Sequence, residues 1–246
     1  MPLLEVEGAS KSFGGVCAVH DVSFALEQNE LIGIMGPNGS GKTTLFNLIA
    51  GALAPDAGSV RLGGREIAGL APHRICAHGI ARTFQLVRPF AGLTALENVL
   101  VGRLFGRAGA AVAADLAEAE RLLALVGLDG RGETPAARLT LIDRKRLELA
   151  RALATGPRLL LLDEFMAGLN PAEIASAMAL IRRLVADGLT VLMVEHIVWA
   201  LMELSRRIIV LSAGEKIAEG APDAVAADPA VVDVYLGVDR VSPMRA

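Results

Sequence analysis

Cysteine is scarce in this sequence, and neither sign of charge dominates. Two cysteines, Cys17 and Cys76, occur in 246 residues. They form neither a C-x-x-C pair nor a zinc-binding spacing, so a reduced, cytosolic setting is expected. Lys and Arg number 24 against 27 Asp and Glu, which gives a net charge of −3. Nucleic-acid binders normally carry a basic excess, so we expect no nucleic-acid partner.

Long apolar runs are also missing, although the mean hydropathy is high at +0.48. A membrane-spanning helix needs about 20 consecutive apolar residues. The apolar stretches here, such as residues 159–162, 191–194 and 208–211, are much shorter and are interrupted by charged or turn residues. They are typical of buried strands in a parallel sheet. The first five residues lack the basic start and apolar core of a signal peptide.

The apolar residues that are present form short, regular segments. They make up 53% of the chain, against 21% charged residues, which excludes a disordered chain. In the first third the pattern predicts strands at 3–7, 16–27, 31–35, 59–62 and 65–67, and a helix at 43–50. The middle is helical, with helix starts at Thr94 and Thr140 and a periodic segment at 115–126. The last third alternates strands (159–162, 190–194, 208–211) with helices (171–187, 197–204).

Strand–helix alternation in both outer thirds predicts an α/β fold with a parallel sheet covered by helices. We therefore expect a single domain over 1–246. Its core, with an antiparallel β subdomain, is formed by 1–87 and 157–246, and a helical subdomain is inserted at 88–156.

One Gly-rich loop carries specific chemistry. It matches G-x-x-x-x-G-K-[ST], follows a predicted strand and opens a predicted helix, and it comprises Gly36, Pro37, Asn38, Gly39, Ser40, Gly41, Lys42, Thr43 and Thr44. Its backbone N–H groups and the helix N-terminus favour phosphate. We expect Lys42 to reach the β- and γ-phosphates and the Thr43 hydroxyl to bind Mg²⁺. A Gly-rich turn with a solvated lysine is the alternative, and the strand–loop–helix context argues strongly against it.

Two acids follow the apolar run at 159–162. Because ligands of parallel sheets bind beyond the carboxyl ends of the strands, Asp163 and Glu164 are expected at the phosphate site. Asp163 would hold Mg²⁺ through water, and Glu164 would polarise the attacking water. Solvated acids at a strand end are common, so this interpretation depends on the phosphate loop upstream.

With these motifs, the chain resembles the ATP-binding subunits of ABC transporters over nearly its whole length. Residues 82–85 resemble the Q-loop, 167–170 the D-loop, and 194–196 the switch-histidine region. The resemblance implies that Gln85 contacts Mg²⁺ and the attacking water, that His196 contacts the γ-phosphate and that Phe13 stacks on adenine. The alternatives are a loop hydrogen bond for Gln85, a packed or surface position for His196, and a core position for Phe13.

The chain departs from the family in the signature, usually Leu-Ser-x-Gly-Gln. The equivalent residues here are Leu139, Thr140, Leu141, Ile142 and Asp143. The resemblance implies that this segment meets ATP bound by the opposite subunit. Ile142 would then crowd the phosphate, and Asp143 would repel it unless turned back into a capping box with Thr140. We therefore expect an asymmetric heterodimer, although the altered residues could serve only to cap the helix.

The resemblance implies a RecA-like P-loop NTPase core, ATP and Mg²⁺ as cofactors, and a position on the cytoplasmic, inner face of the cell membrane. The implied partners are a second ATP-binding subunit (a paralogue, or a second copy of this chain), separate permease subunits and, indirectly, a periplasmic or surface solute-binding protein. Residues 82–101, 166–171 and 228–237 resemble the branched-chain amino-acid uptake group. Import of these or related small polar or amide solutes is thus expected.

Three alternatives remain open at this point: an ATP subunit of lipid or polysaccharide export, a soluble non-transport ABC ATPase, and a nucleotide-regulated binding module. The chain has neither the tandem ATP domains nor the coiled-coil insertion of the soluble class. We also expect an apolar groove between Gln85 and Arg107 that receives a permease helix, with Phe90 and Leu93 as candidate lining residues.

Overall fold

The computed structural model describes residues 1–84, 87–106 and 112–236. An antiparallel sheet occupies the N-terminal part, with the strand order β2-β1-β4-β5. Its strands are β1 (Leu4–Phe13), β2 (Val16–Leu26), β4 (Ala57–Leu62) and β5 (Arg65–Glu66). β1 and β2 form a hairpin through Gly14 and Gly15, which both have the positive φ that favours glycine.

A second sheet forms the centre of the molecule, with the order β10-β9-β3-β8-β7-β6. Its strands are β3 (Leu31–Met35), β6 (Ile80–Arg82), β7 (Leu159–Asp163), β8 (Thr190–Val194), β9 (Arg207–Ser212) and β10 (Glu215–Gly220). All neighbours pair in parallel except β10 and β9. Every residue of β3, β7 and β8 is buried, which explains their uninterrupted apolar sequences.

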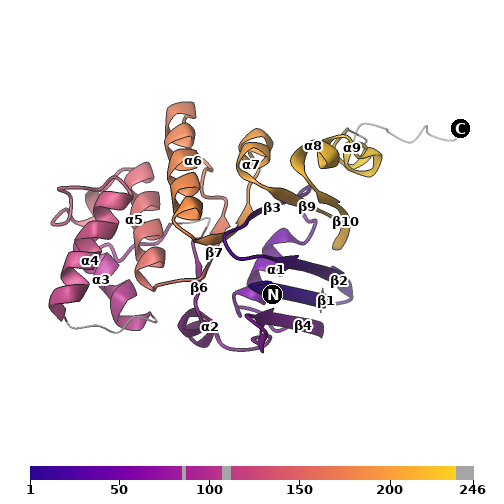
Figure 1. Cartoon of the computed structure of the whole chain (residues 1–246), viewed down its shortest axis with the longest axis horizontal. Helices are drawn as coiled ribbons and strands as arrows, with labels where there is room; N and C mark the ends of the chain where they lie inside the picture. The colour runs from indigo at the N-terminus through magenta and orange to yellow at the C-terminus, as the bar shows by residue number, and fades with distance from the viewer. Residues whose placement is uncertain (85–86, 107–111, 237–246) are drawn as a thin grey trace, which may run out of the picture.

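The helix α1 (Lys42–Ile49) lies between the two sheets (Figure 1). Its apolar side chains pack in one cluster with both sheets, including Leu159 and Leu161 of β7. The alternate β7 residues, Leu160 and Leu162, pack on the other face with helices α6 (Pro171–Ala186) and α7 (Val198–Leu204). The sheet is therefore covered on both faces, and the carboxyl ends of its parallel strands lie at one edge.

The remaining helices lie at two ends of the molecule (Figure 1). At one end, α3 (Ala95–Phe105) contacts both α4 (Val112–Leu125) and α5 (Leu141–Ala154), which is preceded by the 3₁₀ turn Ala136–Arg138. At the other end, α8 (Pro222–Ala226) and α9 (Pro229–Leu236) contact β10. Within the described residues, no helix is both long and apolar enough to cross a membrane.

The structure confirms the predicted strand–loop–helix unit and the strand–helix alternation of the last third. The sequence patterns did not predict α2 (Pro72–His78), β6, β10, α8 or α9. These elements are short, so they carry too few residues for a periodic signal, and tertiary contacts determine their structure.

Candidate active site

The phosphate loop lies where β3 ends and α1 begins. It lines a cavity of about 290 Å³ together with two residues that follow neighbouring parallel strands, Glu164 after β7 and His196 after β8. From the loop itself, Asn38, Gly39, Ser40, Gly41, Lys42, Thr43 and Thr44 line the cavity. The structure thus brings together most of the site residues predicted at the strand ends.

Two glycines of the loop are required by close backbone contacts. A Cβ atom on Gly41 would lie 2.4 Å from the Ala18 carbonyl oxygen, and one on Gly36 would lie 2.1 Å from that of Leu211. Both glycines also have positive φ angles, 100° and 153°. The loop can therefore pass tightly between β2 and β9 only with glycine at these positions.

Lys42 is buried at the start of α1, with an exposed fraction of 6%. Its Nζ donates to the carbonyl oxygens of Gly36 (2.7 Å) and Pro37 (2.8 Å). Burial lowers the pKa of Lys42, and the nearby negative charge of Glu164 opposes that shift. The ammonium group is thus held at the loop, where phosphate oxygens would contact it.

Glu164 directly follows β7 and lies beside the phosphate loop. It has a positive φ of 50°, a strained conformation for a residue other than glycine. Its N–H donates to the Val194 carbonyl oxygen (2.9 Å), and its Oε1 lies 2.8 Å from Nε2 of His196. The carboxylate therefore lines the same cavity as Lys42.

Asp163 lies next to this cavity but is not one of its lining residues. Its Oδ2 accepts from the Arg82 guanidinium (2.6 Å), and its N–H donates to the Thr83 hydroxyl (3.3 Å). Asp163 and Arg82 form a buried ion pair, with side chains 7% and 9% exposed. No sequence pattern predicted a role for Arg82.

Two buried charged residues form hydrogen bonds with the backbone of the turn after β7. Neither was predicted from the sequence. Lys145 on α5 donates to the carbonyl oxygens of Phe165 (2.8 Å) and Glu164 (3.4 Å). Glu195 accepts from the Met166 N–H (2.7 Å), and burial raises the pKa of Glu195 to about 7. Together they connect α5 and β8 to the strained backbone at Glu164. No sequence pattern reveals these contacts, because Glu195 directly precedes His196 and Lys145 is one of several charged residues in an amphipathic helix.

Phe13 lies at the end of β1 and is 46% exposed, with Lys11 Nζ 5.8 Å from its ring centroid. Its exposure excludes the core alternative, although Phe13 does not line the cavity described above. Gln85 lies outside the described residues.

The signature segment, 139–143, lies at the start of α5, on an element that does not contribute to this cavity. Asp143 is buried and paired within the chain. Its Oδ2 accepts from the Thr140 hydroxyl (2.7 Å) and from Arg131 (2.5 Å). Thr140 caps α5 as predicted, because its hydroxyl accepts from the Asp143 N–H (3.3 Å). The box is not reciprocal, because the Asp143 carboxylate is bound by side chains and not by the Thr140 N–H.

Ile142, the next position of the segment, is half-buried. It lines a small cavity of about 130 Å³, open to the surface, with Val126, Phe165 and Leu180 of the same chain. The exposed apolar side chain of the segment is Leu141, which is 52% exposed and lies beside Gly168. A phosphate or partner that approaches this helix end would therefore meet Leu141 first.

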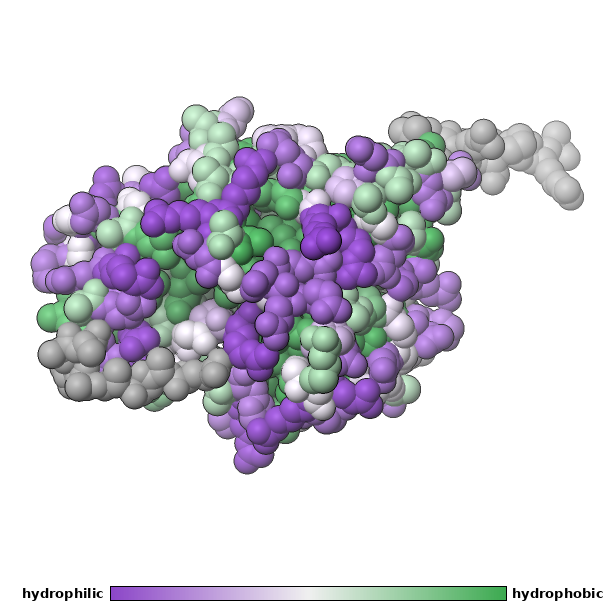
Figure 2. All heavy atoms as spheres, viewed as in Figure 1, coloured by the Kyte–Doolittle hydropathy of each residue, from purple (hydrophilic) through white to green (hydrophobic). Residues whose placement is uncertain are grey.

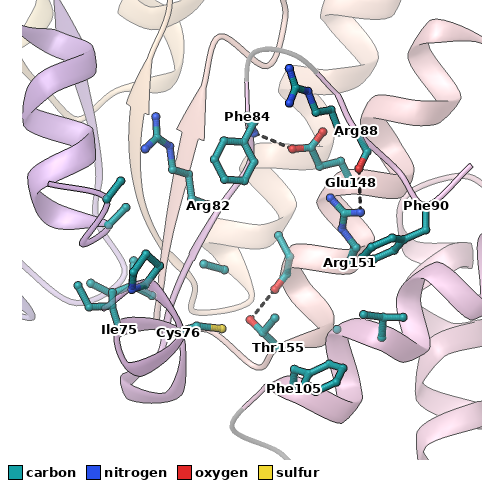
Figure 3. Close-up of a pocket in the computed structure, with 18 residues that line it drawn as sticks. Ile75, Cys76, Arg82, Phe84, Arg88, Phe90, Phe105, Glu148, Arg151 and Thr155 are labelled. Carbon is teal, nitrogen blue, oxygen red and sulfur yellow. Dashed lines mark hydrogen bonds between the residues drawn. The ribbon is translucent and has the colours of Figure 1, made fainter. Parts of the chain in front are cut away.

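A third cavity, of about 410 Å³, lies between α2, β6, α3 and α5 (Figure 3). Apolar residues from all four elements line it, including Ile75, Ile80, Val101 and Phe105. Phe90 lines it as predicted, whereas Leu93 does not. We call this 410 Å³ cavity the apolar groove.

Figure 2 shows a mostly hydrophilic surface on the face of the molecule seen in Figure 1, with apolar side chains visible mainly in hollowed parts near its centre.

Comparison with known proteins identifies the family. The model of the family described as "ABC transporter" matches residues 19–167, which is more than half of the chain. The chain belongs to the ABC transporter family. A second family model, "Branched-chain amino acid ATP-binding cassette transporter", matches residues 215–241.

Individual ABC proteins agree with this assignment. The high-affinity branched-chain amino acid transport ATP-binding protein BraF of Pseudomonas aeruginosa is 39% identical, covering 96% of this chain and 98% of BraF. MJ1267, an ATP-binding cassette of an ABC transporter solved in its ADP conformation, superimposes with a TM-score of 0.88 at 31% identity, covering 96% of this chain and 99% of MJ1267. The dimeric ATP-binding cassette MJ0796, bound to ADP and Pi, gives 0.80 at 27% identity, covering 89% and 98%.

As an ABC ATPase, the chain binds nucleotide and hydrolyses ATP. The P-loop NTPase fold predicted from the sequence is confirmed.

Proposed function

We propose that this chain is the ATP-hydrolysing subunit that energises an importer of branched-chain amino acids or related small solutes. The similarity to BraF over almost the whole of both chains carries this proposal. The second match, at residues 215–241, supports it independently, because it covers a C-terminal segment beyond the part matched by the general ABC model.

The site geometry supports a division of roles among its residues. The loop 36–44 would cradle the phosphates, Lys42 would neutralise the β- and γ-phosphates, and Glu164 would accept a proton from the attacking water. His196, hydrogen-bonded to Glu164, would keep that carboxylate oriented and contact the γ-phosphate.

The chain offers Mg²⁺ hard oxygen donors near the phosphate loop: Thr43 lines the cavity, and Asp163, which Arg82 binds in this structure, follows Leu162 at the adjoining strand end. A hydroxyl at Thr43 and a carboxylate at Asp163 are hard oxygen donors, and Mg²⁺ usually takes one or two protein ligands beside phosphate and water. Gln85 is the third proposed contact. When bound, the ion would neutralise charge that develops on the phosphates.

The apolar groove is the proposed docking site for a permease subunit. Phe90 and Phe105 are 49% and 78% exposed, which is unusual for large apolar side chains that face only water. A helix from a membrane-embedded partner would cover them. The chain would thus sit on the inner face of the cell membrane, and a periplasmic or surface solute-binding protein would act through the permease.

The signature geometry supports a pairing of this chain with a paralogue. Its exposed Leu141 and its internally paired Asp143 give phosphate few polar partners. ATP on this chain's loop would be completed by a partner with an ordinary signature. ATP on the partner's loop would face residues 139–143 and turn over slowly.

The direct experiment is to purify the tagged chain from membranes of its native host and identify the proteins that accompany it. We expect membrane-spanning chains and a second ATP-binding subunit. Recovery with ribosomal or DNA-associated proteins, and without any membrane-spanning chain, would contradict the transport assignment.

A further inference from the structure

Lys145 lies in the second turn of α5 and reaches the turn that follows β7. Its side chain is buried, and its Nζ donates to the carbonyl oxygens of Phe165 (2.8 Å) and Glu164 (3.4 Å). Leu141, one helical turn earlier on the same face of α5, lies beside Gly168. One face of α5, the helix that begins with the altered signature, therefore runs along residues 164–168.

The contacts around Glu164 fix the two peptide groups on either side of its Cα atom. The Glu164 N–H, in the first peptide group, donates to the Val194 carbonyl oxygen (2.9 Å). The Glu164 carbonyl oxygen, in the second peptide group, accepts from Lys145. Because peptide groups are planar, holding both of them determines φ and ψ of the residue between them. Glu164 is thereby kept at its strained, positive φ of 50°.

The next peptide group along the chain is held from both sides. Its carbonyl oxygen, on Phe165, accepts from Lys145, and its N–H, on Met166, donates to Oε1 of the buried Glu195 (2.7 Å). The turn thus lies between a cationic donor on α5 and a carboxylate acceptor directly after β8. Without Lys145, this peptide group would keep only the hydrogen bond of its N–H.

An ammonium group at this position is costly to bury. Burial lowers the pKa of Lys145, and the negative charges of three nearby carboxylates oppose that shift, those of Glu195, Glu148 and Glu164. Its two hydrogen bonds go to backbone carbonyl oxygens, and its Nζ lies 6.0 Å from the Phe165 ring centroid. An apolar side chain would fill the same space at a lower desolvation cost. The charge is therefore best explained by the strained turn that it holds.

We propose that Lys145 is a positioning residue for hydrolysis, which keeps Glu164 where its carboxylate meets His196 in the phosphate cavity. Oε1 of Glu164 lies 2.8 Å from Nε2 of His196, and both residues line that cavity. The helix that begins with the altered signature thus also holds the hydrolytic carboxylate of its own chain. This inference rests on the base role proposed above for Glu164.

The first test measures the Glu164–His196 hydrogen bond in the full chain without nucleotide. The nitrogen chemical shift of His196 Nε2 reports this bond, and Glu164→Ala gives the value for the broken bond. Lys145→Met keeps the length of the side chain and removes the donor. Its His196 signal should therefore move at least half of the way toward that of Glu164→Ala.

Arg144→Met is the matched control for the loss of two hydrogen bonds from the same helix. Arg144 precedes Lys145 and donates to the carbonyl oxygens of Leu139 (2.9 Å) and Ala137 (3.1 Å), which lie outside the turn after β7. Its His196 signal should equal that of the wild type. A His196 signal that is unchanged in folded Lys145→Met, or that moves equally in Arg144→Met, would overturn the proposal.

Removal of Lys145 leaves two buried carbonyl oxygens without this donor, so folding of Lys145→Met is checked by denaturant unfolding. Lys145→Gln is the second variant, because its amide keeps an N–H donor. Its shorter side chain should move the His196 signal in the same direction by a smaller amount. If Lys145→Met does not fold, an unchanged signal in Lys145→Gln refutes the positioning role.

The second test separates nucleotide binding from chemistry. The hydrogen bonds of Lys145 go to the turn after β7, so free Lys145→Met should bind a fluorescent ATP analogue as tightly as the wild type. Hydrolysis by the assembled transporter should fall by roughly 100-fold, the cost of misplacing a reacting group by about 1 Å. Arg183→Gln, on the exposed face of α6, is the control for both measurements and should change neither.

The outcomes distinguish the positioning role from the base role. If Lys145→Met loses affinity as much as hydrolysis, or keeps full hydrolysis while Glu164→Gln loses it, the positioning role fails. If Glu164→Gln itself keeps full activity, the base role proposed for Glu164 fails, and this inference fails with it.

Discussion

At the scale of single residues, the site depends on a strained backbone position held by buried charges. Glu164 has a positive φ, and residues of this kind cost on the order of 1–3 kcal/mol unless their surroundings fix them. Lys145 binds the carbonyl oxygens of this turn, and Glu195 binds the Met166 N–H. The strain is therefore maintained by contacts from α5 and β8, which directs the Glu164 carboxylate into the cavity.

Replacement of Glu164 by Gln keeps the shape of the side chain and removes its ability to accept a proton. ATP should still bind, and hydrolysis should fall by roughly 10²- to 10⁴-fold, the usual cost of a lost general base. Phosphate release from the assembled transporter measures the loss. Full activity of Glu164→Gln would show that another group orients the water.

Lys42→Ala removes the ammonium group at the phosphate loop. A hydrogen bond to a charged group contributes about 1.5–3 kcal/mol, so affinity for ATP should fall roughly 10- to 100-fold. Equilibrium binding of a fluorescent ATP analogue measures this change. Affinity and turnover equal to those of the wild type would refute the phosphate-loop assignment.

Glu195 should make stability depend on pH. Burial raises its pKa from 4.5 to about 7, so the folded chain holds this proton more tightly than the unfolded chain. The contribution of Glu195 to the free energy of unfolding therefore falls as the pH rises from 4.5 to about 7 and stays low above that range. Glu195→Gln keeps an acceptor for Met166 and removes this loss.

The measurement is denaturant unfolding of Glu195→Gln and wild type at pH 5 and pH 8. At pH 8 the variant should be more stable by up to about 3 kcal/mol, and at pH 5 the difference should largely disappear. The exposed Glu27→Gln serves as control. A stability difference that is the same at both pH values would contradict the assigned burial effect.

At the scale of elements, the sequence predicts best where local and tertiary preferences agree. The unit β3–loop–α1 follows from an apolar run, a Gly-rich turn and a helix start, and the structure has all three. Thr94 and Asn170 cap α3 and α6 in capping boxes as their spacing suggests. Asp143 forms only half of such a box. Its N–H donates to the Thr140 hydroxyl, but its carboxylate is bound by Arg131, which precedes α5 in the chain.

The identity of the site residues could largely be predicted from the sequence, whereas the contacts between them could not. Glu164 and His196 were predicted from their positions at the ends of strands, and the phosphate loop from its motif. All three line one cavity. The Arg82–Asp163 pair joins residues 81 positions apart on adjacent strands, which only the sheet register reveals. The same limit applies to Ile142, which lines a cavity together with residues of α4 and α6.

The apolar groove gives a prediction at this scale. Phe105→Glu places a charge at the exposed apolar end of α3, where a permease helix would otherwise exclude water. Assembly with the permease should be lost, while nucleotide binding by the free chain should be retained. Leu116→Glu is the matched control, since Leu116 on α4 is 42% exposed and outside the groove. Copurification of the permease with each tagged variant measures assembly, and equal recovery of both variants would place docking elsewhere.

At the scale of the whole molecule, the altered signature predicts two unequal ATP sites in a dimer with a paralogue. The site on this chain's loop has Lys42, Glu164 and His196, and it would be fast. The matching glutamate-to-glutamine change in the partner should therefore reduce total turnover much less than Glu164→Gln. Steady-state ATPase rates of the two assembled variants test this difference. Equal losses, or a fully active homodimer of this chain, would contradict the asymmetry.

The central claim is that hydrolysis at Glu164 drives import of a branched-chain amino acid. The most direct measurement follows phosphate release and uptake of radiolabelled leucine together, in vesicles that contain the assembled transporter, its solute-binding protein and internal MgATP. The account predicts that wild type and Arg183→Gln accumulate leucine while ATP is hydrolysed, and that Glu164→Gln loses both activities together. Leucine accumulation that persists in Glu164→Gln, or wild-type hydrolysis without any uptake, would contradict it.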